Sequence, residues 1–518
     1  MDTGSGFRQT LPVRSRRQGD PTSRIRTSQE WAVTVFDDAP VAAFSDIWRE
    51  LVAADGAAAA AMQAWDAMDR TTVQCDPDRT MALTALALDH LPENYRQACL
   101  LEMAWNSVHG SRPDYALHRR CVDQWWIGSG RASVADVKPV PKPRRPRRDQ
   151  RLRIGFLAQM MLRNPHYFNT AIVPTLAALP KDQFAVFLYA EGSHPLPETL
   201  VSLVEHAKPL GDLNSAAWDI AADDLDVLFY LNGFGAYSPF QLLRARPATR
   251  IASMMHCYTT FGPELIDAVV QDRDLVTPVH AQTLHEVVVE SDGPVLMLGV
   301  SADAPPVVTA PRHRVGHIVF GAFNRANKIT AELALAWAQI LDSVPKSTLL
   351  LANFTYQHVN HRKSVLSLLS DAGVDLERVA IAPFTSETAE YLGLYSTVDI
   401  ALDTAPFNGG ITTLDAISQG VPVVTLCSED PNGCMGRYFL SHVGRHDLVT
   451  NDHASYVHRA IALADEGGAL DHWRDTARDR LLASRLIRPG DFSDRFADVV
   501  RTVLATPSAP DRAVARGG

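Results

Sequence analysis

Two successive series of short apolar runs, separated by stretches with helical spacing, limit the fold of this chain more than any other feature. The runs lie at 152–158, 184–190, 227–231 and 251–255, and then at 317–323, 348–352, 379–382, 399–402 and 421–426. Short runs without polar alternation indicate strands buried on both faces, as in parallel sheets covered by helices. The Pro-rich stretch 304–312 separates the two series. We therefore expect an α/β fold of two doubly wound domains facing one another across a cleft.

The rest of the chain divides into a helical region, a linker and two tails. Apolar residues recur at helical spacing from Phe44, Ile47 and Trp48 to Leu117 and Cys121, which predicts a small all-helical domain. A length of 518 residues agrees with about three domains. The expected organisation is a disordered basic tail at 1–30, an all-helical domain at 31–135, a Pro/Arg linker at 136–150, α/β domains at 151–310 and 311–505, and a disordered tail at 506–518.

Charge and composition exclude several classes of protein. No run of about 18 uncharged apolar residues occurs, so no membrane insertion is expected. Outside the basic segments 1–27 and 137–153, the chain carries 35 basic and 56 acidic residues. This acidic body argues against nucleic acid as a partner. Six scattered cysteines and the lack of a secretory apolar segment favour a cytoplasmic location. The Arg-rich leader also resembles an organellar transit peptide.

The stretch DTAPFNGGITTLDA, which begins at Asp403, joins a predicted strand to a predicted helix. Its glycines allow close backbone approach, and the N–H groups and dipole at a helix start favour a diphosphate. The spacing of Thr412 and Asp415 equally fits a capping arrangement. From this stretch alone, helix capping and anion binding both remain open.

The stretch FNRANKIT, from Phe323 to Thr330, occupies a second turn between a strand and a helix. Turns of this kind open on the same edge of a parallel sheet, and Lys328 is positioned to reach a phosphate there. A solvated lysine is the common alternative. The pairing of a cationic turn with a Gly-rich turn favours a shared anion site.

At this point residues 151 to about 505 resemble the O-linked N-acetylglucosamine transferase family, which includes the bacterial cytoplasmic N-glucosyltransferases of adhesins. The resemblance rests on LRIGF (152–156), LNGF with RARPA (231–234 and 244–248), FNRANKI (323–329), and LDTAPFNGGITTLD with GVPVVT (402–415 and 420–425). It implies a GT-B fold of two Rossmann-like domains and an inverting mechanism. It also implies sugar transfer from a UDP donor to a protein or peptide side chain, with the UDP-sugar as co-substrate and no cofactor or metal.

The resemblance also assigns roles to individual residues. Lys328 corresponds to the lysine that neutralises the donor diphosphate, and Asp415 to the acid that binds the ribose hydroxyls. Tyr391 stands where mammalian-type members place a histidine against the uracil, and its ring is able to stack there. The residues expected to bind the donor are Asn324, Lys328, Tyr391, Asn408, Gly409, Gly410, Thr412, Thr413 and Asp415.

The chain departs from the family pattern on the acceptor side. Asn164 stands where the family has a histidine, and His166 follows two residues later in the loop after the first strand. His166 and His256, which both follow strands at the same edge, are the candidate catalytic residues together with Lys328. Thr388 and Ile411 also differ from the mammalian-type residues. Asp224 and Asp226 form a D-x-D match that we interpret as loop solvation, so no metal site is expected.

Three functions follow from these observations. The first is an inverting, metal-independent transferase that moves a hexose or N-acetylhexosamine from a UDP-sugar to Ser/Thr or Asn of a protein. The second, motivated by the missing histidine, is a catalytically weak relative that acts as a binding or partner module. The third is a transferase with a non-protein acceptor. The sequence does not separate glucose from N-acetylglucosamine as the donor sugar.

Overall fold

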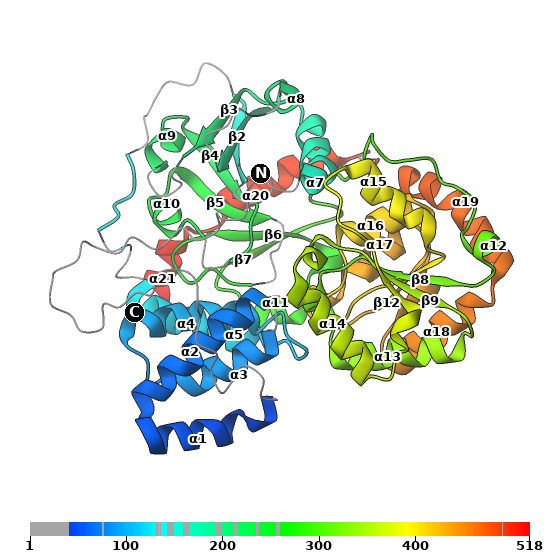
Figure 1. Cartoon of the computed structure of the whole chain (residues 1–518). Helices are drawn as coiled ribbons and strands as arrows, with labels where there is room; N and C mark the ends of the chain where they lie inside the picture. Colours follow the sequence, from blue (N-terminus) through cyan, green and yellow to red (C-terminus); the bar gives the residue numbers. More distant parts are fainter. Residues whose placement is uncertain are drawn as a thin grey trace, which may run out of the picture.

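A computed structural model shows two α/β domains side by side, with a helical domain against the first (Figure 1). It describes residues 41–74, 77–130, 134, 136–141, 150–158, 165–191, 196, 198–211, 216–234, 238–254, 259–488 and 490–517. The predicted tail at 1–30, most of the predicted linker, Asn164 and His256 lie outside the described residues.

The helical domain packs through its last helix onto the first α/β domain. Its helices are α1 (Phe44–Asp55), α2 (Ala57–Gln74), α3 (Pro77–Ala87), α4 (Glu93–Asn106) and α5 (Tyr115–Trp125). Trp125 of α5 lies 4.6 Å from Phe240, ring centre to ring centre, and both join a core that includes strand residues. Asp123 adds a polar contact, because its carboxylate lies 2.5 Å from His285 Nε2. The helical domain is therefore fixed to its neighbour by both apolar and polar contacts.

The first α/β domain contains a seven-stranded parallel sheet in the order β3-β2-β1-β4-β5-β6-β7. The strands are β1 (Leu152–Ala158), β2 (Phe184–Glu191), β3 (His206–Leu210), β4 (Leu225–Tyr230), β5 (Ala248–Met254), β6 (Ala268–Asp272) and β7 (Val287–Ser291). Its helices are α7 (Pro165–Ala178), α8 (Glu198–Val201), α9 (Ala217–Ala221), α10 (Phe240–Arg244) and α11 (Pro278–Thr283). The strand order reverses next to β1, which places loops around a crevice at the carboxyl edge of the sheet.

The second α/β domain contains a six-stranded parallel sheet in the order β10-β9-β8-β11-β12-β13. The strands are β8 (Val319–Ala322), β9 (Thr348–Leu351), β10 (Val379–Ile381), β11 (Ile400–Leu402), β12 (Val423–Leu426) and β13 (Val449–Thr450). The helices are α12 (Arg312–Val315), α13 (Ala331–Ser343), α14 (Val359–Asp371), α15 (Thr388–Gly393), α16 (Ile411–Ser418), α17 (Met435–His442), α18 (His453–Ala464) and α19 (Gly467–Ala483). The two parallel sheets confirm the predicted α/β fold of GT-B type.

All nine predicted apolar runs contain a strand, whereas β3, β6, β7 and β13 were not predicted. The edge strand β3 has only one buried residue, Leu210, so it carries no buried apolar run. Strands β6 and β7 end in polar residues, and β13 spans only two residues. Strands that are short, polar at one end or at a sheet edge therefore lack the apolar run by which the others were predicted.

The C-terminal helix α20 (Phe492–Ala505) returns to the first α/β domain, although the sequence placed it in the second. Its Phe496 ring lies 5.7 Å from Phe229 of β4 and 5.7 Å from Phe184 of β2. The amphipathic face of α20 is compatible with either sheet, so periodicity alone does not assign it to a domain.

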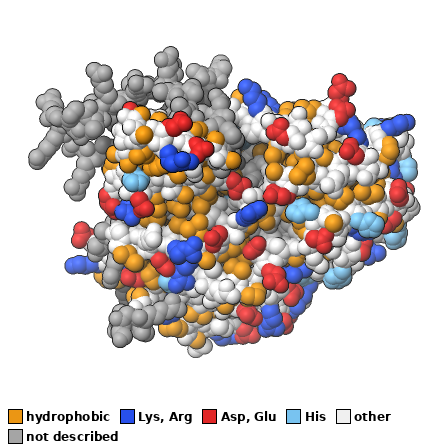
Figure 2. Space-filling view, turned by 90° about the horizontal axis from the view of Figure 1, so that it is seen from below, with side chains coloured by type: hydrophobic (Ala, Val, Ile, Leu, Met, Phe, Trp, Pro, Cys, Tyr) orange, Lys and Arg blue, Asp and Glu red, His pale blue; other side chains and the backbone are white. Residues whose placement is uncertain are grey.

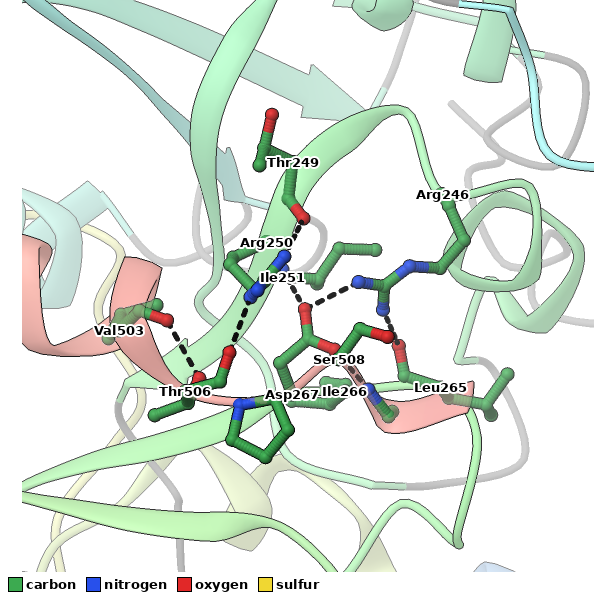
Figure 3. A network of polar contacts seen from close by, with 12 residues as sticks. Arg246, Thr249, Arg250, Ile251, Leu265, Ile266, Asp267, Val503, Thr506 and Ser508 are labelled. Carbon is green, nitrogen blue, oxygen red and sulfur yellow. Dashed lines mark hydrogen bonds and ion pairs between the residues drawn. The ribbon is translucent and has the colours of Figure 1, made fainter. Parts of the chain in front are cut away.

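The predicted disordered tail at 506–518 is instead ordered over most of its length, because α21 (Ala509–Gly517) follows α20. The Asp267 carboxylate accepts hydrogen bonds from the Ala509 N–H at 2.6 Å and from Arg246 at 2.5 Å (Figure 3). Arg512 donates to the Asp267 carbonyl at 2.8 Å. Asp267 of the first domain thus holds the segment that contains α21. Because Asp267 is distant in sequence, local patterns near residue 509 do not predict this contact.

Within the described residues, no helix is long and apolar enough to cross a membrane.

Candidate functional site

A cavity of about 780 Å³ lies between the two α/β domains. It is lined by residues at or just after the ends of strands, such as Asp272 of β6, Asn324 after β8 and Asn353 after β9. The site is therefore at the carboxyl edges of both sheets, as expected for doubly wound domains. The predicted residues that line it are His166, Asn324, Lys328, Tyr391, Asn408, Gly410, Thr412 and Asp415.

The buried carboxylate of Asp403 holds the turn that follows β11. Its Oδ1 accepts hydrogen bonds from the N–H of Gly409 at 2.7 Å and of Thr404 at 2.9 Å, and from the Asn324 side chain at 3.3 Å. Its Oδ2 accepts from the Thr425 hydroxyl at 2.8 Å. Burial raises the pKa of Asp403 to about 6, although these hydrogen bonds oppose the rise. The sequence analysis treated Asp403 only as a strand end.

The two glycines of the turn have different roles. A Cβ at Gly409 would lie 2.5 Å from Thr412 Oγ1 and 3.0 Å from Asp403 Oδ1, whereas a Cβ at Gly410 would meet open space. The Gly409 N–H and the Thr413 hydroxyl are both used inside the turn, the latter on the Gly409 carbonyl at 3.2 Å. In this structure Gly409 thus shapes the turn and Thr413 ties the start of α16 to it, and their expected role in donor binding stays a prediction.

The capping arrangement suggested by Thr412 and Asp415 is absent. Helix α16 begins after Gly410, which makes no side-chain cap. The Thr412 hydroxyl donates instead to Asn324 Oδ1 at 3.3 Å, and the Asp415 carboxylate faces His166. The polar side chains at the start of α16 are therefore directed to the cavity and to the neighbouring domain.

Lys328 ends the 3-10 turn Ala326–Lys328 and places its ammonium group at the cavity. Nζ donates to the Asn408 carbonyl at 2.8 Å and lies 3.7 Å from the centre of the Phe407 ring. Burial and the nearby charge of Arg325 lower the pKa of Lys328 well below its ordinary value. Because an anion beside Nζ favours the charged form, this ammonium is set to bind a negatively charged group.

His166 and Asp415, predicted for separate roles, meet across the cavity. His166 stands in the first turn of α7, and its Nε2 lies 3.0 and 2.9 Å from the two carboxylate oxygens of Asp415. Burial acts to lower the pKa of His166, but the hydrogen bond and charge of Asp415, helped by Asp303, raise it overall. Burial raises the pKa of Asp415, and His166 opposes this rise. The pair links the two domains.

Tyr391 contributes an aromatic surface to the cavity. Its ring meets the edge of His166 with 5.8 Å between ring centres, and its hydroxyl lies 3.2 Å from that of Tyr395. Tyr395 stacks on Phe323 at 3.7 Å and donates to the Thr412 carbonyl at 3.1 Å. These contacts fix the position of Tyr391 beside the start of α16.

Asp272, which the sequence analysis missed, places a second carboxylate on the first-domain side of the cavity. It ends β6 and accepts a hydrogen bond of 2.8 Å from the Tyr438 hydroxyl of α17. Burial raises its pKa, although the hydrogen bonds from the Asp274 N–H and from Tyr438 oppose the rise. The available signal was the polar end of an apolar run, AVVQD, at the edge where His256 was predicted.

The remaining candidates do not add to the site. His256 and Asn164 lie outside the described residues, so their predicted roles are not placed by the structure. The Asp226 carboxylate accepts a hydrogen bond of 2.8 Å from the Arg153 N–H, in the body of the first domain. In the part of the chain that the structure describes, no cluster of three His, Cys, Asp or Glu residues has the geometry of a metal site.

The architecture and the interdomain cavity define a GT-B protein. A solved structure of an O-GlcNAc transferase mutant from Thermobaculum terrenum superposes with a TM-score of 0.73, covering 89% of this chain and 86% of that one, at 24% sequence identity. This likeness shows the shared fold.

Sequence comparison finds similarity to one glycosyltransferase family over part of the chain. Residues 307–494 match glycosyl transferase family 41. Over 285 residues, or 55% of this chain, the sequence is 30% identical to a probable UDP-N-acetylglucosamine–peptide N-acetylglucosaminyltransferase SPINDLY of Solanum lycopersicum. It is also 30% identical over 157 residues to the UDP-N-acetylglucosamine–peptide N-acetylglucosaminyltransferase of Caenorhabditis elegans. Over about half of its length the chain is therefore similar to the O-linked N-acetylglucosamine transferase-like proteins, and residues 307–494 carry the family 41 match. The match spans 30% of the tomato protein and 13% of the nematode protein.

Proposed function

We propose that this chain is an inverting, metal-independent glycosyltransferase that moves a hexose or N-acetylhexosamine from a UDP-sugar to a protein side chain. The observation that carries the proposal is the wall of the cavity formed by the family 41 region. There the buried ammonium of Lys328 and the start of α16 face the same space as Asn324 and Asp415. Such a wall suits a nucleoside diphosphate, with cationic and N–H groups for the phosphates and a carboxylate for hydroxyl groups.

The donor is expected to lie along this wall. Lys328, Asn324, Thr412 and the positive end of α16 bind the diphosphate. Tyr391 offers its ring to the uracil and Asp415 accepts hydrogen bonds from the ribose hydroxyls. Because His166 already holds the Asp415 carboxylate, the ribose either shares that carboxylate with His166 or displaces it.

The transfer breaks the bond between the anomeric carbon and the UDP oxygen while the acceptor oxygen or nitrogen attacks from the opposite face. Negative charge develops on UDP, and Lys328 together with the α16 dipole stabilises it in a largely buried environment. Holding donor and acceptor in line lowers the barrier further. No step of this proposal uses a metal ion.

Two groups of the first domain are suited to take the acceptor proton. Asp272 is a buried carboxylate at the cavity, and His166 is an imidazole whose buried Nδ1 has no hydrogen-bond partner among the described residues. Replacing each group by asparagine separates the two possibilities. The asparagine variant that lacks the catalytic base loses activity at every pH. The variant that keeps the base still shows activity that changes with pH as the base is protonated.

The acceptor is proposed to be a protein or peptide, as the printed activities of the tomato and nematode relatives suggest. A cytoplasmic location fits such an acceptor. The face shown in Figure 2 mixes basic and acidic side chains without a broad basic patch, which gives no support to a nucleic-acid partner.

The test is mass spectrometry of proteins co-expressed with the full chain. Proteins that gain a hexose or N-acetylhexosamine with the wild type, and lose it with Lys328→Ala, support the proposal. Lys363→Ala, which removes an exposed lysine from α14 of the same domain, serves as the matched control and retains the modification. A proteome without any added sugar contradicts a protein acceptor.

A further inference from the structure

The loop between α4 and α5 of the helical domain touches the same turn that carries the proposed donor site. The His109 ring lies 5.2 Å from that of Phe407, and Trp105 stacks on His109 at 4.1 Å with an interplanar angle of 24°. Lys328 Nζ lies 3.7 Å from the centre of the same Phe407 ring. The helical domain is thus connected to the proposed phosphate-binding ammonium through a single aromatic ring.

A second contact joins the same two regions. The Asn432 side chain donates to the Val108 carbonyl at 2.9 Å, and its N–H donates to the Tyr115 hydroxyl at 3.2 Å. The Asn432 carbonyl in turn accepts the N–H of Asn408 at 3.0 Å. Since the Asn408 carbonyl accepts from Lys328, the helical domain supports both groups that contact Nζ.

The contacts of His109 and Phe407 bear on the charge of Lys328. Within the described residues, Lys328 forms no direct ion pair with a carboxylate. Its buried ammonium is offset by the Asn408 carbonyl, by the negative face of the Phe407 ring and by the nearby charge of Asp403. His109 is suited to hold that ring because it adds no charge. Burial lowers the pKa of His109 to about 3, and the nearby charges of Arg325 and Lys328 act in the same direction.

We propose that His109 is a positioning residue of the donor site, which holds the Phe407 ring under Lys328 so that the helical domain completes the diphosphate subsite. This inference rests on the proposed use of a UDP-sugar. It gives the helical domain a direct part in donor binding. The ring of His109 acts through Phe407 and itself lies behind the residues that line the cavity.

The test compares UDP with uridine by calorimetric titration of the full chain. His109→Ala leaves Phe407 free to turn away, so UDP binding weakens about tenfold, the scale of a desolvated cation–π contact. Uridine, which has no phosphate, binds with unchanged affinity. The matched control is His90→Ala, which removes another histidine ring packed on a tryptophan of the helical domain and leaves both affinities unchanged.

Two further variants guard against a folding defect in His109→Ala. Phe407→Leu removes the ring from the other side and produces the same loss that is selective for UDP, whereas Phe407→Tyr keeps the ring and restores binding. Two outcomes overturn the inference, provided that the wild type binds UDP. In the first, both His109→Ala and Phe407→Leu bind UDP as tightly as the wild type does. In the second, both variants lose affinity for UDP and for uridine equally. A wild type that binds neither ligand removes the proposed function and this inference with it.

Discussion

The two walls of the cavity are held in place differently. On the second-domain wall, the turn after β11 is fixed mainly by hydrogen bonds within that domain, with Asp403 at their centre, and the helical domain adds the contact of His109 with Phe407. On the first-domain wall, His166 and Asp272 each bond to a residue of the opposite domain, Asp415 and Tyr438 respectively. The turn at the centre of the donor wall therefore depends mostly on its own domain, whereas the positions of His166 and Asp272 depend on how the two α/β domains meet.

The largest effect is expected at the centre of the donor wall. Asp403→Ala removes a buried carboxylate that accepts four hydrogen bonds and leaves their donors unsatisfied. The free energy of unfolding is expected to fall by about 3–5 kcal/mol. Urea denaturation of the full chain measures this loss. A decrease below about 1 kcal/mol, the scale of one ordinary hydrogen bond, would show that the turn does not depend on Asp403.

The paired glycines provide the next comparison. Gly409→Ala forces a methyl group against Thr412, Thr413 and Asp403, so a loss of about 1–3 kcal/mol in unfolding free energy is expected. Gly410→Ala points a methyl group into open space and is its matched control, with little effect on stability. Thermal unfolding of the two variants side by side tests the difference. Equal destabilisation would contradict the assignment of a structural role to Gly409 alone.

The link between His166 and Asp415 is expected to depend on pH. Because Asp415 raises the folded-state pKa of His166, the link contributes stability that is complete below the ordinary histidine value of about 6.5. That contribution disappears as pH rises through the raised value. Burial also raises the pKa of Asp415, so its own contribution to stability falls as pH rises, over a lower pH range that begins at the ordinary aspartate value of about 4. Comparing wild type with His166→Asn from acidic to alkaline pH measures the effect, and a pH-independent difference would exclude it.

The smallest effect is expected at the other contact across the cavity. Tyr438→Phe removes one hydrogen bond to Asp272, which still accepts the N–H of Asp274 at 3.1 Å. We expect a loss of about 1 kcal/mol and a further rise in the pKa of Asp272, because a donor to its charged form is lost. Denaturant unfolding measures the loss of stability, and a pH–rate profile measures the change in the pKa of Asp272. A loss as large as that of Asp403→Ala would remove the contrast between the walls.

The sequence predicted the donor wall better than the facing wall for a physical reason. Lys328, Asn408 and Thr412 belong to turns between a strand and a helix, and parallel topology alone brings such turns together. The contacts of His166 with Asp415 and of Asp272 with Tyr438 join residues of different domains. Their geometry depends on how the domains dock, which no local pattern encodes.

The details within the donor wall show the same limit. The spacing of Thr412 and Asp415 fits a capping box, but tertiary partners at Asn324 and His166 take both side chains. Likewise Gly409 and Gly410 are the same residue type, and the sequence gives no reason to treat them differently. Their roles differ because Thr412 packs against Gly409 and not against Gly410. Local propensity was overridden where a residue of another segment offered a better hydrogen bond.

The most direct test of the account is calorimetric titration of UDP into the full chain and into Lys328→Ala. The account predicts that the wild type and the Lys363→Ala control bind UDP alike, and that Lys328→Ala weakens binding at least about a hundredfold through loss of a buried charge-assisted contact. Undiminished UDP binding in Lys328→Ala, or no binding by the wild type, would contradict the assignment of this wall to a UDP-sugar.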